Sequence, residues 1–357
     1  MKKALVAMSG GVDSSVAAYL AQRAGYACIG CTMRLYHNED AGLSENRTCC
    51  SLEDAEDARS VAYRLGMPFY VFNFTECFRK RVMVPFAEAY ERGQTPNPCI
   101  ECNRCMKFDA LLRRAEELGC EKIVTGHYAR IEEQDGRYLL KKGPNERKDQ
   151  SYVLYAMTRH ELSHTLFPLG GMTKDETRRI AEECGFLNAH KRDSQDICFA
   201  PDGDYAAAVE RISGKKSVPG DFVLSDGRVV GEHRGIIHYT VGQRRGLGVS
   251  YCEPLYVCRI EPETNRVVLG PECELLRREI FVSDVNWISG KAPLGSIRCG
   301  VRTRYHAKEA PALVTADGTG AHILFDTPQR AGAPGQAAVF YDGDTVLGGG
   351  TIQNAMP

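Results

Sequence analysis

Apolar runs of strand length alternate with amphipathic segments of helix length through the first 130 residues of this 357-residue chain. Strands and helices that alternate at this spacing predict a parallel sheet with helices on both faces. Ligands of such sheets bind at the carboxyl ends of the strands, so residues there are the first candidates for function. The expected strands are residues 3–8, 28–35, 69–74 and 122–125, and the expected helices are residues 14–24, 53–65, 77–92 and 108–118.

The pattern changes in the second half of the chain. An Asp-Gly turn at residue 136 predicts a hairpin, and helical segments are expected near residues 151–157 and 175–184. Beyond about Ser217, turn signals separate short strands, which predicts mostly β structure in two small modules that meet near residues 279–289. The expected strands there include residues 256–260, 266–269, 297–301 and 337–340.

Length and composition are ordinary for a globular protein of two or three domains, with 43% hydrophobic and 25% charged residues. No apolar run approaches the roughly 20 residues that a membrane-spanning helix needs. The apolar stretch at residues 4–8 is also shorter than the core of a signal peptide, which takes roughly 7–15 residues. We therefore expect a cytoplasmic protein with no membrane partner.

The 15 cysteines do not indicate a disulfide-stapled fold, because the chain is large and shows no export signal. The adjacent Cys49 and Cys50 are expected to lie in a loop, since a disulfide between neighbours is strained. Several others lie singly in apolar surroundings, where a thiol behaves as a small core residue. These are Cys28, Cys77, Cys120, Cys184, Cys258 and Cys299.

A net charge of −1 does not by itself indicate a nucleic-acid partner. An RNA ligand would require a local basic surface within this balanced total. Short basic clusters occur at residues 79–81, 215–216, 244–245 and 277–278, and at Arg302 with Arg304. They permit an RNA partner without demonstrating one, and no DNA partner is expected.

The segment Ser-Gly-Gly-Val-Asp-Ser-Ser at residues 9–15 lies between the first expected strand and the first expected helix. Its glycines allow a tight turn with exposed N–H groups, and the helix dipole favours an anion there. The bland alternative is a serine-capped helix after a glycine turn. The segment has neither the Gly-Lys-Ser/Thr of a Walker A site nor the spacing of a dinucleotide fingerprint. It resembles the phosphate loop of PP-loop ATPases, which split ATP between the α and β phosphates and adenylate an oxygen of their substrate.

A second motif, Cys-x-x-Cys-x-x-Cys at residues 99–105, follows Pro96 and Pro98. Both prolines restrict the backbone, so we expect a stiff loop before the helix at Phe108. Zinc is disfavoured because no second Cys-x-x-Cys completes four ligands. Two other interpretations stay open. One is an iron–sulfur cluster held by Cys99, Cys102 and either Cys198 or Cys105, and the other is a pair of catalytic thiols that exchange a persulfide.

Several long motifs, which follow one another in the order found in a known family, make a closer resemblance. They are residues 9–15, 95–103, 125–130, 148–152, 194–199, 239–248, 302–305 and 334–336. Across the whole chain they resemble the tRNA-specific 2-thiouridylase family, bacterial enzymes that thiolate the wobble uridine of tRNAs for lysine, glutamate and glutamine. The resemblance implies an α/β parallel-sheet PP-loop domain (adenine nucleotide α-hydrolase-like) at residues 1–205, a small mostly β central domain at 206–278 and a β-barrel-like tRNA-binding domain at 279–357.

The resemblance also implies roles for individual residues. Cys198 would accept sulfur as a persulfide from a cysteine desulfurase or a relay protein, and Cys102 would be the partner thiol that closes a disulfide with it. ATP, with Mg²⁺, would be bound by Ala7, Met8, Ser9, Gly10, Gly11, Val12, Asp13, Ser14, Met33 and Gly126. The target base would be bordered by Asn97, Pro98 and Cys99, and tRNA would be contacted by His127, Lys148, Asp149, Gln150, Arg304, Tyr305 and Gln336.

Three points stay open at this level. Some family members have aspartate, a candidate general base, where this chain has Cys99, so that role is in doubt here and the cluster alternative gains weight. His127 is as often a structural hydrogen-bonding residue as an RNA contact. The competing functions are an amide-forming PP-loop ligase, which leaves Cys102 and Cys198 unexplained, and a non-catalytic RNA-binding protein, which leaves the phosphate loop unexplained.

Overall fold

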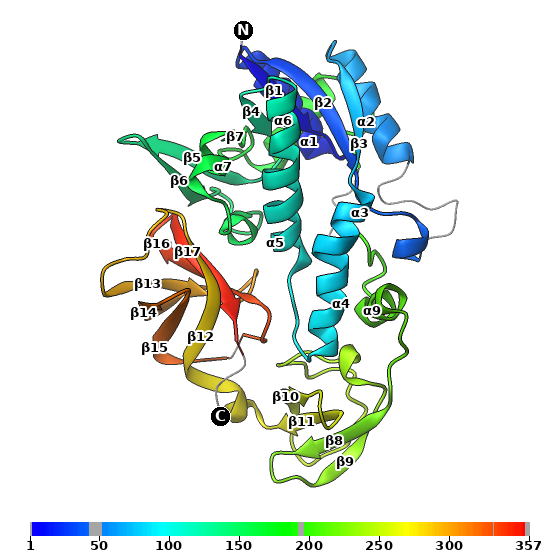
Figure 1. The fold of residues 1–357 in the computed structure, drawn as a ribbon, viewed down its shortest axis with the longest axis vertical. Coiled ribbons are helices and arrows are strands. Elements are labelled where there is room, and N and C mark those ends of the chain that lie inside the picture. Colours follow the sequence, from blue (N-terminus) through cyan, green and yellow to red (C-terminus); the bar gives the residue numbers. More distant parts are fainter. Residues whose placement is uncertain (1, 43–51, 192–195, 331, 354–357) are drawn as a thin grey trace.

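The computed structural model describes residues 2–42, 52–191, 196–330 and 332–353. Its first domain is built on a parallel sheet in the order β3-β2-β1-β4-β7 (Figure 1). The strands are β1 (Lys3–Ala7), β2 (Ala27–Arg34), β3 (Phe69–Asn73), β4 (Lys122–Val124) and β7 (Thr165–Leu166). The predicted α/β class and the four predicted strands are confirmed. The adjacent Cys49 and Cys50 and the stretch 192–195 lie outside the described residues.

The sheet is covered on both faces, which explains why its central strand is apolar throughout. Ala4, Leu5 and Val6 of β1 have no exposed surface. Ala4 and Val6 pack against α1 (Val12–Arg23) and α2 (Leu52–Arg64), whereas Leu5 packs toward α6 (Leu111–Glu117). A strand buried on both faces has no polar side, as expected for a parallel sheet.

The chain order changes direction beside β1, since β2 pairs with one edge of it and β4 with the other. In open α/β sheets a crevice forms at the carboxyl ends of the strands at such a switch point. The segments that leave β1 and β4 there are the predicted phosphate loop and the residues Thr125, Gly126 and His127. The fold therefore places two of the conspicuous motifs at the same edge of the sheet.

Two helical runs leave the sheet and extend toward the rest of the molecule (Figure 1). The first comprises α3 (Thr75–Phe78), a π-helical turn η2 (Arg79–Met83) and α4 (Val84–Glu91). The second comprises α5 (Pro98–Cys102), a π-helical segment η3 (Asn103–Ala110) and α6. Single π-type turns inside helices are uncommon and are often found at functional sites.

The prediction of a stiff loop up to Phe108 is wrong, because the helix already begins at Pro98. Pro98 occupies the first helical position, and the Asn97 side chain accepts a hydrogen bond from the Cys99 backbone N–H at 3.1 Å. Proline at that position and asparagine at the cap are both helix-start signals. All three cysteines of the motif therefore lie on a helical run.

The central domain is a four-stranded sheet in the order β10-β11-β8-β9, preceded by α9 (Tyr205–Ser213). Its strands are β8 (Gly220–Leu224), β9 (Val229–His233), β10 (Tyr256–Glu261) and β11 (Arg266–Gly270). Other short elements of the chain are η1 (Glu39–Ala41), η4 (Ser151–Leu154), α7 (Arg159–Ser163), α8 (Lys174–Glu183), η5 (Ile236–His238) and η6 (Glu272–Leu275). The helix expected at residues 151–157 is thus a short 3₁₀ turn.

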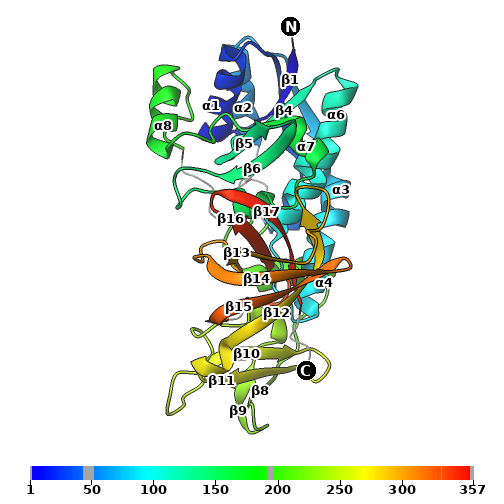
Figure 2. The same cartoon turned by 90° about the vertical axis from the view of Figure 1, so that its left-hand side faces the viewer.

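The C-terminal domain is an antiparallel barrel of six strands, closed by the pairing of β12 with β17. Its strands are β12 (Leu276–Trp287), β13 (Ser296–Arg302), β14 (Ala310–Asp317), β15 (Gly320–Arg330), β16 (Ala337–Asp342) and β17 (Thr345–Ile352). The predicted hairpin, β5 (Ala129–Gln134) and β6 (Arg137–Lys142), joins this sheet where Lys141 pairs with Thr345. Figure 2 shows the hairpin beside β16 and β17, so the first domain and the barrel share one sheet. Among the described residues, no helix combines the length and apolar character needed to cross a bilayer.

Candidate active site

The phosphate loop is a tight turn in which the packing requires glycine at position 10. Gly10 has φ +76°, and a Cβ on it would come within 2.4 Å of the Asp54 carbonyl oxygen. The Ser14 hydroxyl donates to the Gly11 carbonyl at 2.9 Å and accepts from the Ser9 backbone N–H at 3.2 Å. The loop is therefore held in one shape by its own residues before any ligand binds.

Asp13 is held by residues that are distant in the sequence. Its carboxylate accepts a hydrogen bond from the Tyr128 hydroxyl at 2.7 Å and lies 2.7 and 2.8 Å from the Lys174 ammonium. Asn188 donates its amide to the Gly10 carbonyl and to the Ser15 hydroxyl, both at 2.9 Å. The sequence motifs did not indicate Tyr128, Lys174 or Asn188 as residues of this site.

One local signal would have located Lys174. Thr173 and Glu176 form a capping box, in which each side chain bonds the other's backbone N–H. A threonine followed three residues later by glutamate marks a helix start. Lys174 is then the first residue of α8, a position that the predicted helix at 175–184 only just missed.

The segments predicted to bind ATP do come together. A Cβ on Gly126 would lie 2.8 Å from the backbone carbon of Asp13 and 2.9 Å from the Ser14 nitrogen, so only glycine fits between β4 and the loop. Met8 is buried at the end of β1, and its carbonyl accepts a bond from Thr32 at 2.7 Å. Met33 is half-buried near the end of β2. These residues lie at the carboxyl ends of β1, β2 and β4.

The two cysteines predicted to be catalytic lie on two segments that share one hydrophobic cluster. Cys102 on α5 and Cys198 are both half-buried and pack against the cluster that contains Phe78 and Phe199. The Tyr36 hydroxyl donates to the Cys198 carbonyl at 2.7 Å, which fixes the backbone there. Two cysteines that are far apart in the sequence thus pack against the same hydrophobic cluster.

Cys99 lies one helical turn before Cys102 and is exposed to solvent. Nearby protein atoms still desolvate the thiol and raise its pKa, while the positive charge of Lys107 opposes that rise. Burial also raises the pKa of Tyr305 to about 12, with smaller contributions from Asp149 and Cys99. Cys99, Lys107 and Tyr305 are thus electrostatic neighbours, although they come from three separate segments.

His127 is buried among aromatic rings at the carboxyl end of β4. Its Nδ1 lies 2.7 Å from the Thr125 hydroxyl, and its Nε2 lies 3.5 Å from the Lys107 ammonium. The ring packs against Phe108 and Phe167. Burial, reinforced by Lys107, lowers the pKa of His127 well below 6.5, so the imidazole is neutral at pH 7.

Residues 148–150, which were predicted to contact tRNA, are held largely by hydrogen bonds to other groups of the protein. Asp149 is 4% exposed, and its carboxylate accepts bonds from the backbone N–H groups of Gly143 and Ser151. The Gln150 side chain accepts a bond from the Tyr128 backbone N–H at 3.0 Å. Lys148 is half-buried. Asp149 and Gln150 therefore shape this segment and tie it to the residue that bonds Asp13.

Arg302 was expected in a basic surface, and this expectation is wrong. Its side chain is 12% exposed and makes ion pairs with Asp149 at 3.3 Å and Glu309 at 2.9 Å. Its guanidinium also lies over the Tyr341 ring. A buried cation needs such partners, so Arg302 joins the barrel to the 148–150 segment rather than presenting charge to solvent.

Arg304, Tyr305 and Gln336 occupy the junction between the barrel and the other domains. The Gln336 amide donates to the Thr95 carbonyl at 2.7 Å. Tyr305 meets the Tyr152 ring edge-on at 5.9 Å. The Arg304 guanidinium packs on Gly242 of the central domain, and burial together with the nearby Arg330 lowers its pKa.

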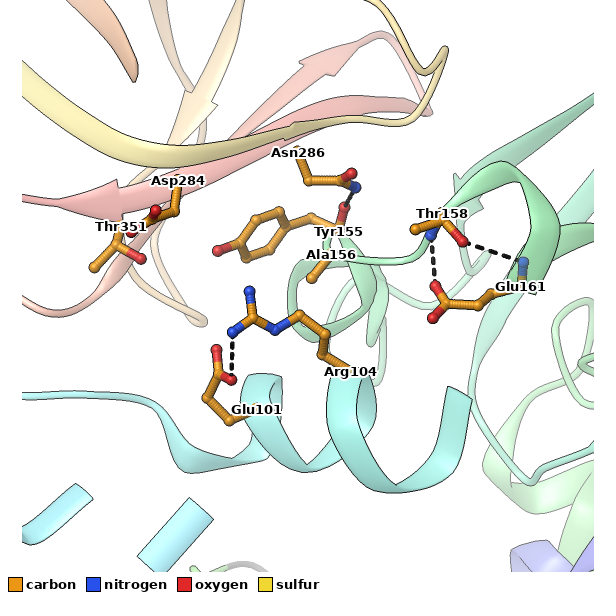
Figure 3. Close-up of a pocket in the computed structure, with 9 residues that line it drawn as sticks. All are labelled: Glu101, Arg104, Tyr155, Ala156, Thr158, Glu161, Asp284, Asn286 and Thr351. Carbon is orange, nitrogen blue, oxygen red and sulfur yellow. Dashed lines mark hydrogen bonds and ion pairs between the residues drawn. The ribbon is translucent and has the colours of Figure 1, made fainter. Parts of the chain in front are cut away.

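A pocket of about 440 Å³ lies between α5 and the barrel. Glu101 and Arg104, which flank Cys102 in the sequence, form an ion pair at 2.7 Å and point toward Tyr155 and strand β12 (Figure 3). The other lining residues are Ala156, Thr158, Glu161, Asp284, Asn286 and Thr351. The pocket contains no phosphate-loop residue and so is not the nucleotide crevice.

The cysteines do not fit an iron–sulfur cluster as they are arranged. Within the part of the chain that the structure describes, no three Cys, His, Asp or Glu side chains gather closely enough to hold a metal ion. A cluster needs its thiolate ligands converging on one centre. We therefore derive no step through a cluster.

Fold and loop together define an ATP-binding PP-loop domain followed by two β domains. The family described as tRNA methyl transferase HUP domain matches residues 2–202. The tRNA methyl transferase PRC-barrel domain matches residues 208–271, and the aminomethyltransferase beta-barrel domain matches residues 277–352.

Full-length relatives identify the family more closely. The tRNA-specific 2-thiouridylase MnmA of Clostridioides difficile strain 630 is 47% identical over 358 residues, which cover 99% of each chain. The enzyme of the same name from Acetivibrio thermocellus is 49% identical with the same coverage. That of Symbiobacterium thermophilum is 47% identical over 362 residues, covering 99% of this chain and 93% of the relative. The chain belongs to the family of tRNA-specific 2-thiouridylases, which are sulfurtransferases.

Proposed function

We propose that this chain uses ATP to replace O2 of the wobble uridine by sulfur in tRNAs for lysine, glutamate and glutamine. The observation that carries the proposal is the placement of Cys102 and Cys198 on one hydrophobic cluster, while Cys99 of the same helix adjoins Lys107 and hence the end of β4. A phosphate loop alone would fit many acceptors. A pair of thiols on one hydrophobic cluster in the same domain favours sulfur transfer.

The first half of the reaction activates the base. Uracil O2 attacks the α-phosphorus of ATP, an oxygen–phosphorus bond forms, and the bond to pyrophosphate breaks. The N3 proton is released to solvent, so the adenylated base carries no extra charge on the ring. Residues 7–14 would hold the phosphates, and Met33 and Gly126 would border the adenosine. Asp13 is the one carboxylate in the loop. Its oxygens are bonded to Lys174 and Tyr128, so we assign it to fixing the loop rather than to holding the Mg²⁺ that accompanies ATP.

The second half transfers sulfur. A donor protein, such as a cysteine desulfurase or a relay protein, leaves a persulfide on Cys198. The terminal sulfur attacks C2, and the bond between C2 and the oxygen of AMP breaks. The Cys102 thiolate then attacks the Cys198 sulfur, so a disulfide between the two cysteines forms and the thiouridine is released. An external thiol reductant restores both thiols.

The β domains would supply tRNA binding. A wobble base is stacked in the anticodon loop, and extracting it costs a few kcal/mol, which backbone contacts elsewhere can offset. Arg304, Tyr305 and Lys148 are the side chains that we assign to such contacts, with Asn97 and Pro98 bordering the extracted base. His127, Asp149, Gln150 and Gln336 also lie in this region, and their buried or bonded side chains favour a supporting role.

The rival function is a PP-loop ligase that forms an amide on a small molecule. That enzyme would release AMP in response to ammonia or an amino acid and would ignore tRNA. The family descriptions mention methyl transfer, but a phosphate loop beside two thiols suits ATP activation and sulfur chemistry better. Thiolation is therefore the function that gives a role to both the phosphate loop and the two thiols.

The test is Cys198→Ser, assayed with tRNA, ATP, magnesium and a sulfur donor under reducing conditions. We expect no thiouridine by mass spectrometry, while tRNA-dependent AMP formation and tRNA affinity persist. Cys273→Ser, which changes an exposed cysteine between the two β domains, is the matched control and is expected to match the wild type. Normal thiouridine formation by Cys198→Ser would remove Cys198 from the mechanism.

A further inference from the structure

Lys107 is a half-buried residue that the reaction above does not use. It lies on the π-helical segment η3, and its ammonium is 3.5 Å from Nε2 of His127. Among the described residues, it has no carboxylate partner within ion-pair distance, whereas Arg113 on the same helical run pairs with Asp109 at 2.7 Å. A partly desolvated ammonium is costly unless an anion accompanies it.

The neighbour that Lys107 does have cannot supply that anion. His127 is neutral, and with Nε2 facing an ammonium its one proton sits on Nδ1, which donates to Thr125. The imidazole thus orients Lys107 without balancing its charge. The positive charge of Lys107 also acts on the Cys99 thiol. Burial nevertheless raises the pKa of this thiol, so it too is neutral at pH 7.

The position of Lys107 indicates which anion it awaits. Gly126, the residue before His127, packs directly on the backbone of Asp13 and Ser14 in the phosphate loop. Cys99, whose thiol is affected by the charge of Lys107, is the last residue of the segment 97–99 that would border the target base. Lys107 is thus linked to the phosphate loop through His127 and Gly126 and to residues 97–99 through Cys99. Under the proposed function, the α-phosphate that O2 attacks would lie between these two segments.

We propose that Lys107 is a catalytic residue whose ammonium binds the α-phosphate of ATP and of the adenylated base. This inference rests on the proposed function. During activation, negative charge on the α-phosphoryl oxygens increases as the bond to pyrophosphate breaks. During sulfur transfer, AMP departs with one more negative charge than it carried as an ester. A fixed cation stabilises both changes more than it stabilises bound ATP, which is the condition for catalysis.

The experiment compares AMP with adenosine as ligands of the full-length protein, by calorimetry, for the wild type and for Lys107→Met. The two ligands differ only in the α-phosphate. We expect Lys107→Met to weaken AMP binding about tenfold or more and to leave adenosine binding within about twofold. Removing one preorganised charge-stabilising group typically lowers a rate by about 10²–10³-fold, so tRNA-dependent AMP formation should fall by that order.

Two further variants separate charge from structure. Lys107→Arg keeps a cation and is expected to retain most of the preference for AMP over adenosine. Arg113→Met removes an exposed cation from the same helical run and is expected to change neither ligand. Equal weakening of AMP and adenosine, or none of AMP, would overturn the assignment. Failure of the wild type to make thiouridine would instead count against the proposed function, because the ratio of AMP to adenosine binding does not depend on it.

Discussion

The side-chain amide of Gln336 donates a hydrogen bond of 2.7 Å to the backbone carbonyl of Thr95, and this bond joins the barrel to the segment that leads into Cys99. The Thr95 backbone N–H in turn bonds the Pro334 carbonyl at 2.7 Å. Thr95 is thus bonded to the barrel through both of its backbone polar groups. These two bonds tie the segment before α5 to the barrel.

Gln336→Ala is therefore expected to slow thiolation more than it weakens tRNA binding. A lost hydrogen bond of this kind costs about 1 kcal/mol, which corresponds to roughly a fivefold change. We expect a decrease of about that size in the single-turnover rate at saturating tRNA. Gln329→Ala is the matched control, since that amide bonds only Thr327 on its own strand. If the rate were unchanged and the dissociation constant for tRNA rose fivefold, the result would show that Gln336 contacts tRNA directly.

Loss of either member of the Arg302–Asp149 pair is expected to destabilise the protein. Both side chains are nearly inaccessible. Removing one leaves the other buried with one partner fewer, since Glu309 still pairs with Arg302 and backbone N–H groups still bond Asp149, so we expect a cost of about 1.5–3 kcal/mol. Urea denaturation of Arg302→Met, Asp149→Asn and the double variant measures this. The double variant should lose less than the sum of the single losses. A stable Asp149→Asn protein with greatly reduced tRNA affinity would contradict the supporting role and restore Asp149 as an RNA contact.

His127 makes stability depend on pH in a predictable direction. Its pKa in the folded state lies below 6.5, so the unfolded chain binds more protons as the pH falls below about 6.5. The free energy of unfolding should therefore fall with pH below about 6.5, by at most about 1.4 kcal/mol per pH unit from this group, and stay level above it. His127→Gln should remove that part of the slope. Burial also lowers the pKa of His233, so the slope is measured for His233→Gln as a comparison. An identical slope in wild type and His127→Gln would refute the prediction.

Arg304→Ala tests the tRNA surface through its salt dependence. Each phosphate contact contributes about 0.7–0.9 to the slope of log affinity against log salt, so losing one contact should flatten the slope by about that amount. Filter binding between low and moderate salt gives the slope. Arg298→Ala removes an exposed arginine on the same barrel that pairs with Asp326, and it is expected to leave the slope unchanged. Equal slopes for all three proteins would mean that Arg304 meets no phosphate.

The sequence predicted the parallel sheet well because buried strands such as β1 are apolar throughout and the glycine-rich turn follows directly. It did not predict contacts that depend on how distant segments meet. Lys174 and Tyr128 reach Asp13 from more than a hundred residues away, and the β5–β6 hairpin joins the barrel only through the pairing of Lys141 with Thr345. The prediction that Arg302 lies on a basic surface failed for the same reason, because the local sequence around Arg302 does not show that Asp149 is its partner.

The central claim is tested most directly by anaerobic turnover of the wild-type protein with tRNA, ATP, magnesium and a desulfurase that supplies sulfur. Product nucleosides are identified by mass, and AMP and iron are measured in the same sample. We predict 2-thiouridine at the wobble position, about one AMP per thiouridine, and no iron requirement. AMP release that ignores tRNA, with no thiolated base, would contradict the account and favour a ligase that acts on a small molecule.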